Sequence, residues 1–77
     1  MAQTIREALV EVEHELEQAM RTYGPIASPH EAHSVIGEEF EEFWEEVKER
    51  NQDTEAMRRE LIQTAAMCVR AIIDLKL

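Results

Sequence analysis

The sequence predicts an all-α fold: a three-helix protomer that assembles into an oligomeric helical bundle. Gly24, Pro25 and Pro29 form one break in the chain, and a polar stretch at residues 50–53 forms a second. The three segments between these breaks repeat apolar residues at helical spacing, and none alternates as a strand would. We therefore expect helices at about residues 3–23, 29–50 and 53–76.

The first segment carries recognisable start and stop signals. Thr4 followed by Glu7 predicts a capping box, and Gly24 followed by Pro25 is a typical helix end. The apolar residues recur every three or four positions and form a narrow stripe like a coiled-coil seam. They are Ile5, Leu9, Val12, Leu16, Ala19 and Tyr23.

The second segment opens with Ser28-Pro29-His30-Glu31. Ser28 is suited to the N-cap, proline to the first helical position, and Glu31 to the return bond of a capping box. Trp44 lies at one flank of the expected apolar stripe. The stripe consists of Ala32, Val35, Ile36, Phe40, Phe43 and Val47.

The third segment, with Asp53 as the expected N-cap, has an apolar band that is wider than one neighbouring helix can cover. We expect burial on more than one side, and therefore a homodimer or homotetramer. The band consists of Met57, Leu61, Ile62, Ala65, Cys68, Val69, Ile72, Ile73 and Leu75.

Chain length and cysteine content limit how such a protein can be stabilised. A single domain of this size, residues 1–77, buries only about 60% of the surface its unfolded chain exposes. Cys68 is the only cysteine, so a disulfide within the chain is excluded. A bound metal ion or self-association therefore remains as the expected source of extra stability.

The charge balance is strongly acidic, with 17 Asp and Glu against 8 Lys and Arg and a formal charge of −9. This balance disfavours binding to nucleic acid and to anionic membranes. A phosphate-bearing ligand can still be bound through bridging divalent cations. Because no apolar run approaches a membrane span and the N-terminus has no apolar signal region, we expect a cytoplasmic protein.

The stretch GEEFEEFWEE, residues 37–46, contains six glutamates that helical geometry divides into two groups. At about 100° per residue, Glu39, Glu42 and Glu46 border the apolar stripe of their helix. The other three, Glu38, Glu41 and Glu45, point to solvent. The first group is either part of an ordinary solvated face or a set of metal ligands.

Carboxylates at i and i+3 on one helix are about 5–6 Å apart at Cβ, so Glu39 and Glu42 can reach one cation. On the third segment, Glu60 and Gln63 repeat this spacing, and an antiparallel hairpin can bring Glu60 to the pair. Asp74 lies about 21 Å further along the helix and is too distant to join. Oxygen ligands of this kind suit Mg²⁺ and Mn²⁺.

The sequence resembles the MazG-like all-α nucleoside triphosphate pyrophosphohydrolases over about residues 30–75. That superfamily carries an E-x-x-E motif on one helix and an E-x-x-D motif on the next. Glu39-Phe40-Glu41-Glu42 matches the first motif. Glu60-Leu61-Ile62-Gln63 takes the place of the second, with Gln63 where the pattern has Asp.

The resemblance implies Mg²⁺-dependent hydrolysis of a (deoxy)nucleoside triphosphate to the monophosphate and pyrophosphate. Such a reaction would remove unwanted nucleotides from the nucleotide pool. It implies Glu39, Glu42 and Glu60 as metal ligands, with Gln63 as a weaker, uncharged ligand, and Mn²⁺ as a possible substitute for Mg²⁺. Glu39 and Glu42 are the expected catalytic pair, because a carboxylate of this cluster would position the attacking water. The alternative is a non-catalytic oligomeric helical module, a reduced member of the family.

The sequence offers several further residues that could bind substrate. Trp44 could stack on a nucleobase or be buried at a subunit contact, and Met67 could line a base pocket or fill the core. Lys48 is a nearby cation that could reach a triphosphate, and Arg58, Arg59 and Arg70 are others. Cys68 is expected to pack near the core stripe rather than act as a nucleophile.

Overall fold

A computed structural model describes residues 3–77, which form three α-helices and no strand. The helices are α1 (Ile5–Thr22), α2 (Pro29–Lys48) and α3 (Thr54–Asp74). The predicted all-α, three-helix chain is therefore confirmed, with each helix ending one or two residues inside its predicted range. None of these helices is long and apolar enough to cross a membrane.

The predicted caps explain where the helices begin. The Thr4 hydroxyl accepts from the Glu7 backbone N–H, and the Glu7 carboxylate accepts from the Thr4 N–H, which completes the capping box. Ser28 caps α2 through the Glu31 N–H, but the Glu31 carboxylate accepts from Ala27 rather than from Ser28. Asp53 caps α3 by accepting from the N–H groups of the first turn.

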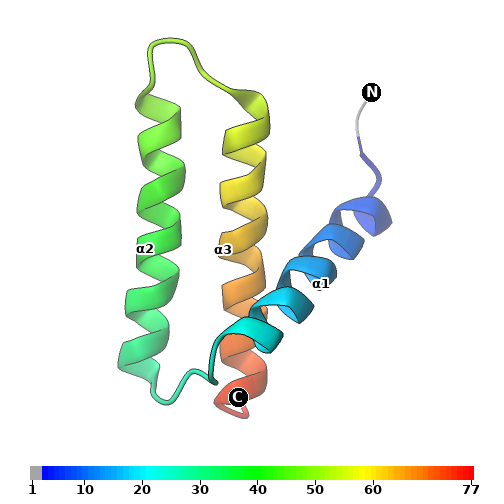
Figure 1. The fold of residues 1–77 in the computed structure, drawn as a ribbon, viewed down its shortest axis with the longest axis vertical. Helices are drawn as coiled ribbons and strands as arrows, with labels where there is room; N and C mark the ends of the chain where they lie inside the picture. Colours follow the sequence, from blue (N-terminus) through cyan, green and yellow to red (C-terminus); the bar gives the residue numbers. More distant parts are fainter. Residues whose placement is uncertain (1–2) are drawn as a thin grey trace.

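The arrangement is built on α3, as Figure 1 shows. Helix α2 runs antiparallel beside α3 and is joined to it by a short loop. Helix α1 crosses α3 at an angle: its C-terminal end lies against Arg70, Glu11 in its middle pairs with Arg58 near the start of α3, and its first turns diverge from the hairpin (Figure 1). Because α1 diverges, Ile5 and Leu9 of its predicted stripe are 80% and 61% exposed. Further along the stripe, Val12 and Leu16 are half-buried and Ala19 is buried.

The core is small and built largely of alanine. Among residues 3–77, no large side chain is fully buried, and Ile26 is the largest of the buried apolar residues. Ile36 and Leu75 pack against the cluster of Ile26, Ala32 and Ala71. This cluster lies at the end of the hairpin where α2 begins and α3 ends. The other buried apolar residues are Ala19, Ala56 and Ala66.

A buried arginine ties the three helices together at this end. The Arg70 guanidinium donates to the backbone carbonyls of Ala19, Tyr23 and Gly24, where α1 ends. It also pairs with Asp74 at 3.1 Å, and the same Asp74 oxygen accepts from the Ile26 N–H in the α1–α2 connection. Arg70 therefore has a structural role, and its side chain also lines the cavity that adjoins Glu39, so its predicted contact with a triphosphate stays a prediction.

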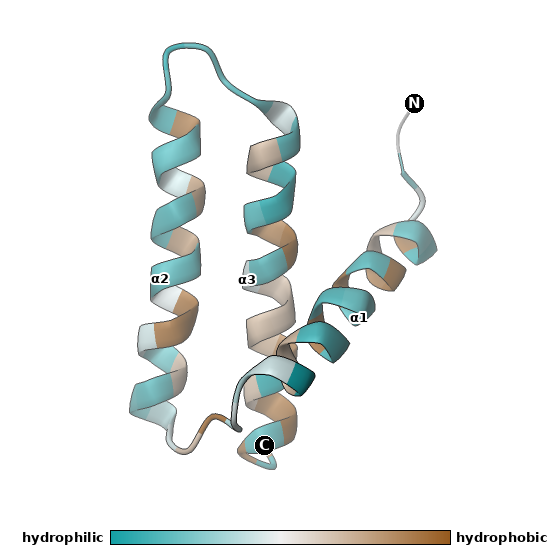
Figure 2. Cartoon of the chain, viewed as in Figure 1, coloured by the Kyte–Doolittle hydropathy of each residue, from teal (hydrophilic) through white to brown (hydrophobic). Residues whose placement is uncertain are grey.

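The wide apolar band of α3 is only partly covered. Figure 2 shows α1 and α2 largely in the hydrophilic colour, whereas much of the C-terminal half of α3 has the hydrophobic one. The prediction that Cys68 packs near the core is wrong, because its side chain is exposed. The other exposed members of the band are Leu61, Val69, Ile72 and Ile73.

Candidate metal centre

Three carboxylates meet between α2 and α3. Glu39 and Glu42 come from the middle of α2, and Glu60 comes from the second turn of α3. One ligand oxygen from each lies within 4.8 Å of the other two. Glu39 and Glu60 are half-buried, and Glu42 is exposed, so the cluster lies at the surface with one side against the hairpin. The structure thus brings together the three glutamates that the spacing predicts.

The glutamates of α2 divide only partly as helical geometry predicts. Glu38, Glu41 and Glu45 are exposed as expected, although Glu38 also lines a cavity together with Glu39. Glu39 is half-buried against α3, whereas Glu42 is exposed. Glu46 is also half-buried but is not among the three clustered carboxylates. Its charge still acts on Glu60, because it contributes to raising the pKa of that carboxyl.

Burial and the close approach of like charges disfavour ionisation of Glu39 and Glu60. Burial, together with the charges of Glu42 and Glu60, raises the pKa of Glu39 to about 7 from its ordinary value of 4.5. Burial and the neighbouring Glu42 likewise raise the pKa of Glu60, while the nearby Arg59 acts in the opposite direction. A divalent cation in this position would remove the repulsion that these shifts express.

Gln63 lies beside the cluster and bridges the two helices. With its Nε2 turned toward the carboxylates, it donates to Glu39 Oε2 at 3.0 Å and to Glu60 Oε2 at 3.1 Å. An amide can instead present its oxygen to a cation after rotation about the last side-chain bond. Gln63 is therefore placed to hold the carboxylates together when they are free and to offer an uncharged ligand to a bound ion.

A cavity of about 640 Å³ adjoins the cluster through Glu39 and Gln63. It lies between α1, the α1–α2 connection and the α2–α3 hairpin, and therefore needs all three helices. Its apolar lining is formed by Ala19, Tyr23, Pro25, Ile26, Val35 and Met67, and its carboxylates by Glu15, Glu31, Glu38 and Glu39. The sequence does not predict Glu15 or Tyr23 as site residues, because only the fold of α1 over α3 brings them near Glu39.

The predicted substrate-binding residues are placed differently. Met67 lines the cavity beside the cluster. Trp44 and Lys48 do not line it: the Lys48 ammonium lies 5.8 Å from the centre of the Trp44 ring and 3.0 Å from a Glu45 oxygen. Arg58 pairs with Glu11 of α1. Of this group, Met67 and the buried Arg70 line the cavity beside the cluster.

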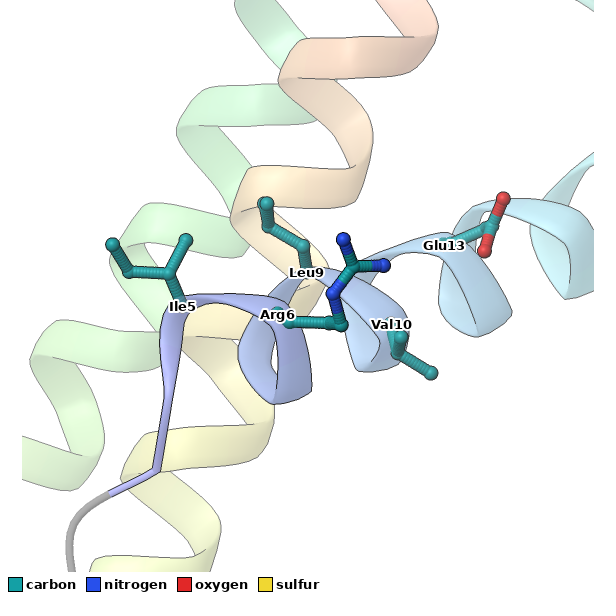
Figure 3. Close-up of a pocket in the computed structure, with 5 residues that line it drawn as sticks. All are labelled: Ile5, Arg6, Leu9, Val10 and Glu13. Atoms are coloured by element: carbon teal, nitrogen blue, oxygen red, sulfur yellow. The ribbon is translucent and has the colours of Figure 1, made fainter.

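A separate hollow follows the first turns of α1 and shares no residue with the cluster. Figure 3 shows its five lining side chains, all from α1: Ile5, Arg6, Leu9, Val10 and Glu13. It has no wall from another helix, so it is an open groove along one helix rather than an enclosed site.

Comparison with known proteins neither supports nor excludes this site. No protein-family model matches the sequence, and no curated protein or solved structure is significantly similar to it. The interpretation of the cluster therefore depends on its own geometry and chemistry.

Proposed function

We propose that the protein is a divalent-metal-dependent nucleotide pyrophosphohydrolase that converts (d)NTP to (d)NMP and pyrophosphate. The observation that carries this proposal is the convergence of Glu39, Glu42 and Glu60, from two helices, within 4.8 Å of one another. Their all-oxygen donor set fits Mg²⁺ or Mn²⁺, both of which prefer carboxylate ligands and retain waters that phosphates can displace.

The bound cation would neutralise charge on the triphosphate and lower the pKa of a bound water. The residues of this chain would hold and orient the reactants. In the reaction, a water oxygen bonds to the α-phosphorus, and the bond from that phosphorus to the bridging α–β oxygen breaks. A carboxylate oxygen of Glu39 or Glu42 would accept a hydrogen bond from this water and align it.

The adjoining cavity supports the same proposal. A volume of about 640 Å³ lies within the range of small-molecule sites, and its lining is apolar beside Met67, Ile26 and Val35. A triphosphate held at the carboxylates would direct its nucleoside toward this space, because Glu39 belongs to both the cluster and the cavity wall, and Gln63 beside the cluster lines the cavity as well.

The test compares two glutamates of the same helix. Both Glu42 and Glu41 are exposed, but only Glu42 belongs to the cluster. We expect Glu42→Gln to lower pyrophosphate release by at least about 100-fold, since even a residue that only hydrogen-bonds to a metal ligand contributes about 10–100-fold. Glu41→Gln should retain wild-type activity. The assay measures pyrophosphate from a panel of NTPs and dNTPs with Mg²⁺ or Mn²⁺.

Mn²⁺ binding, followed by electron paramagnetic resonance, separates the site from the reaction. Glu42→Gln should weaken Mn²⁺ binding, and Glu41→Gln should not. If wild type binds Mn²⁺ but releases no pyrophosphate from any substrate, the hydrolase proposal is wrong and the metal site stands. If it binds no Mn²⁺, the three glutamates form an ordinary acidic surface.

The second candidate is a non-catalytic oligomeric helical module. Two observations favour it: Gln63 in place of an acidic fourth ligand, and large apolar side chains that α3 leaves exposed. This candidate predicts self-association without nucleotide hydrolysis, so the pyrophosphate assay distinguishes it from the first.

A further inference from the structure

Gln63 of α3 contacts two carboxylates of the candidate metal centre. With its amide nitrogen turned toward them, it donates to Glu39 Oε2 on α2 at 3.0 Å and to Glu60 Oε2 on its own helix at 3.1 Å. Ionised carboxylates only accept hydrogen bonds, whereas an amide nitrogen carries two N–H donors. One side chain therefore links two like-charged groups that belong to different helices.

Helical spacing explains why Gln63 lies there. It follows Glu60 by three residues, so both side chains project from the same side of α3. Gln63 is half-buried, and it also lines the cavity that adjoins Glu39. Its amide is therefore held between the helices rather than free in solvent.

No cationic side chain takes the place of this contact. In the part of the chain that the structure describes, the salt bridges of Lys48, Arg58 and Arg70 are formed with other acidic residues. Arg59 is near Glu60, but it is exposed and forms no salt bridge among residues 3–77. The Gln63 amide therefore supplies the hydrogen bonds that join the carboxylates of the two helices.

A divalent cation bound by Glu39 and Glu60 would compete with the same N–H groups. The amide hydrogens carry partial positive charge and would repel a cation held between these two carboxylates. Rotation by about 180° about the last side-chain bond exchanges nitrogen for oxygen and turns the donor into a neutral ligand. An acidic residue at position 63 could act only as a ligand, because an ionised carboxylate has no donor.

From these contacts we propose that Gln63 is a positioning residue: it joins Glu39 to Glu60 when no cation is bound, and it rotates to become a neutral ligand when a divalent cation enters. The inference rests on the metal site of the proposed function but not on hydrolysis. Affinity for a hard cation falls as the number of charged ligands falls. The site therefore binds its cation weakly and reversibly, and the fold does not need the cation in order to bring the glutamates together.

The first test uses Gln63→Glu, which replaces the amide nitrogen with oxygen and keeps the length of the side chain. A fourth carboxylate should raise the affinity for Mn²⁺, measured by electron paramagnetic resonance, by at least about tenfold. It should also lower the Tm in the presence of EDTA, because two hydrogen bonds become contacts between like charges. The matched control is Gln18→Glu, the same change at an exposed position of α1, and it should alter neither quantity.

The affinity distinguishes a positioning role from a merely structural one. Loss of a structural contact lowers the Tm but does not tighten Mn²⁺ binding, so a Gln63→Glu variant that binds Mn²⁺ no more tightly than wild type would overturn the proposal. Mn²⁺ binding by wild type without pyrophosphate release from any nucleotide would overturn the hydrolase and leave the role of Gln63 intact. A wild type that binds no Mn²⁺ would overturn both.

The second test uses the wild-type chain, so it does not depend on the folding of Gln63→Glu. In ¹⁵N-labelled protein, the side-chain amide signals of Gln63, assigned through their own side-chain carbons, should shift as Mg²⁺ is added, because their hydrogen-bond partners change. The signals of Gln18 on the exposed side of α1 should stay in place. Unshifted Gln63 signals in a protein that binds Mn²⁺ would show that the amide does not rotate, and would overturn the proposal while the metal site stands.

Discussion

Two conditions act together on the Glu39 carboxylate. As a residue bordering the core stripe of α2 it is half-buried, and as a member of the cluster it faces two other carboxylates. Both conditions disfavour its charged form, which is why its pKa is raised to about 7. Gln63 reduces this cost by donating an N–H to Glu39, a contact that an aspartate at position 63 would replace with a further negative charge.

The raised pKa of Glu39 predicts how stability depends on pH. Between about 4.5 and 7 the folded chain binds more protons at Glu39 than the unfolded chain does, so the free energy of unfolding should fall as pH rises through this range and level off above it. Urea unfolding at several pH values measures this slope. Glu39→Gln should flatten it, whereas Glu41→Gln should leave it unchanged. Equal slopes for wild type and Glu39→Gln would contradict the assignment.

At the scale of the element, α2 contains a glycine, Gly37, that no close contact within the protomer requires. Gly37 lies in the third turn of a long helix, and no neighbouring atom lies within 4 Å of the position its Cβ would occupy. Glycine in a helix interior costs about 1 kcal/mol relative to alanine. The glycine therefore weakens α2 without serving a contact inside this chain.

We expect Gly37→Ala to raise the free energy of unfolding by about 0.5–1 kcal/mol, measured by urea denaturation. A lower free energy of unfolding for Gly37→Ala would instead indicate that the added methyl group meets a close neighbour at this position.

At the scale of the whole molecule, the Arg70–Asp74 pair determines where α1 lies. Its guanidinium donates to the Tyr23 carbonyl at the end of α1 and to the Ala19 carbonyl, which also accepts from the Tyr23 N–H, and its aspartate fixes the α1–α2 connection at Ile26. Because the cavity beside the cluster is walled by α1 and this connection, the pair also maintains the cavity.

Arg70→Met should destabilise the fold by about 3–5 kcal/mol, because it leaves the buried Asp74 carboxylate without its cationic partner. In a chain with so small a core, thermal denaturation followed by circular dichroism should show a large fall in Tm. The control is Arg59→Met on the exposed side of the same helix, which should change stability by less than about 0.5 kcal/mol. Similar Tm values for the two variants would show that the buried pair is not what holds α1.

Much of this protein follows from local sequence. Thr4, Ser28 and Asp53 set the helix starts through caps that act within a few residues, so all three could be predicted. The separation of Glu39 from Glu38 and Glu41 follows from helical geometry alone. The meeting of Glu42 with Glu60 could be predicted as well, because a short loop between two helices leaves little choice but an antiparallel hairpin.

Other features depend on contacts between residues that are distant in sequence. Arg70 could be recognised as a cation near an acidic residue, but its burial arises from carbonyls of α1 about fifty positions away. The exposure of Leu9 and Cys68 follows from the angle at which α1 crosses α3, which apolar spacing does not specify. The sequence by itself determined three helices and a pair of facing acidic motifs, because caps and helical periodicity are local. Only the tertiary structure decided where α1 lies, which cavity adjoins the carboxylates and which apolar face stays uncovered. These features depend on packing between residues that are distant in sequence.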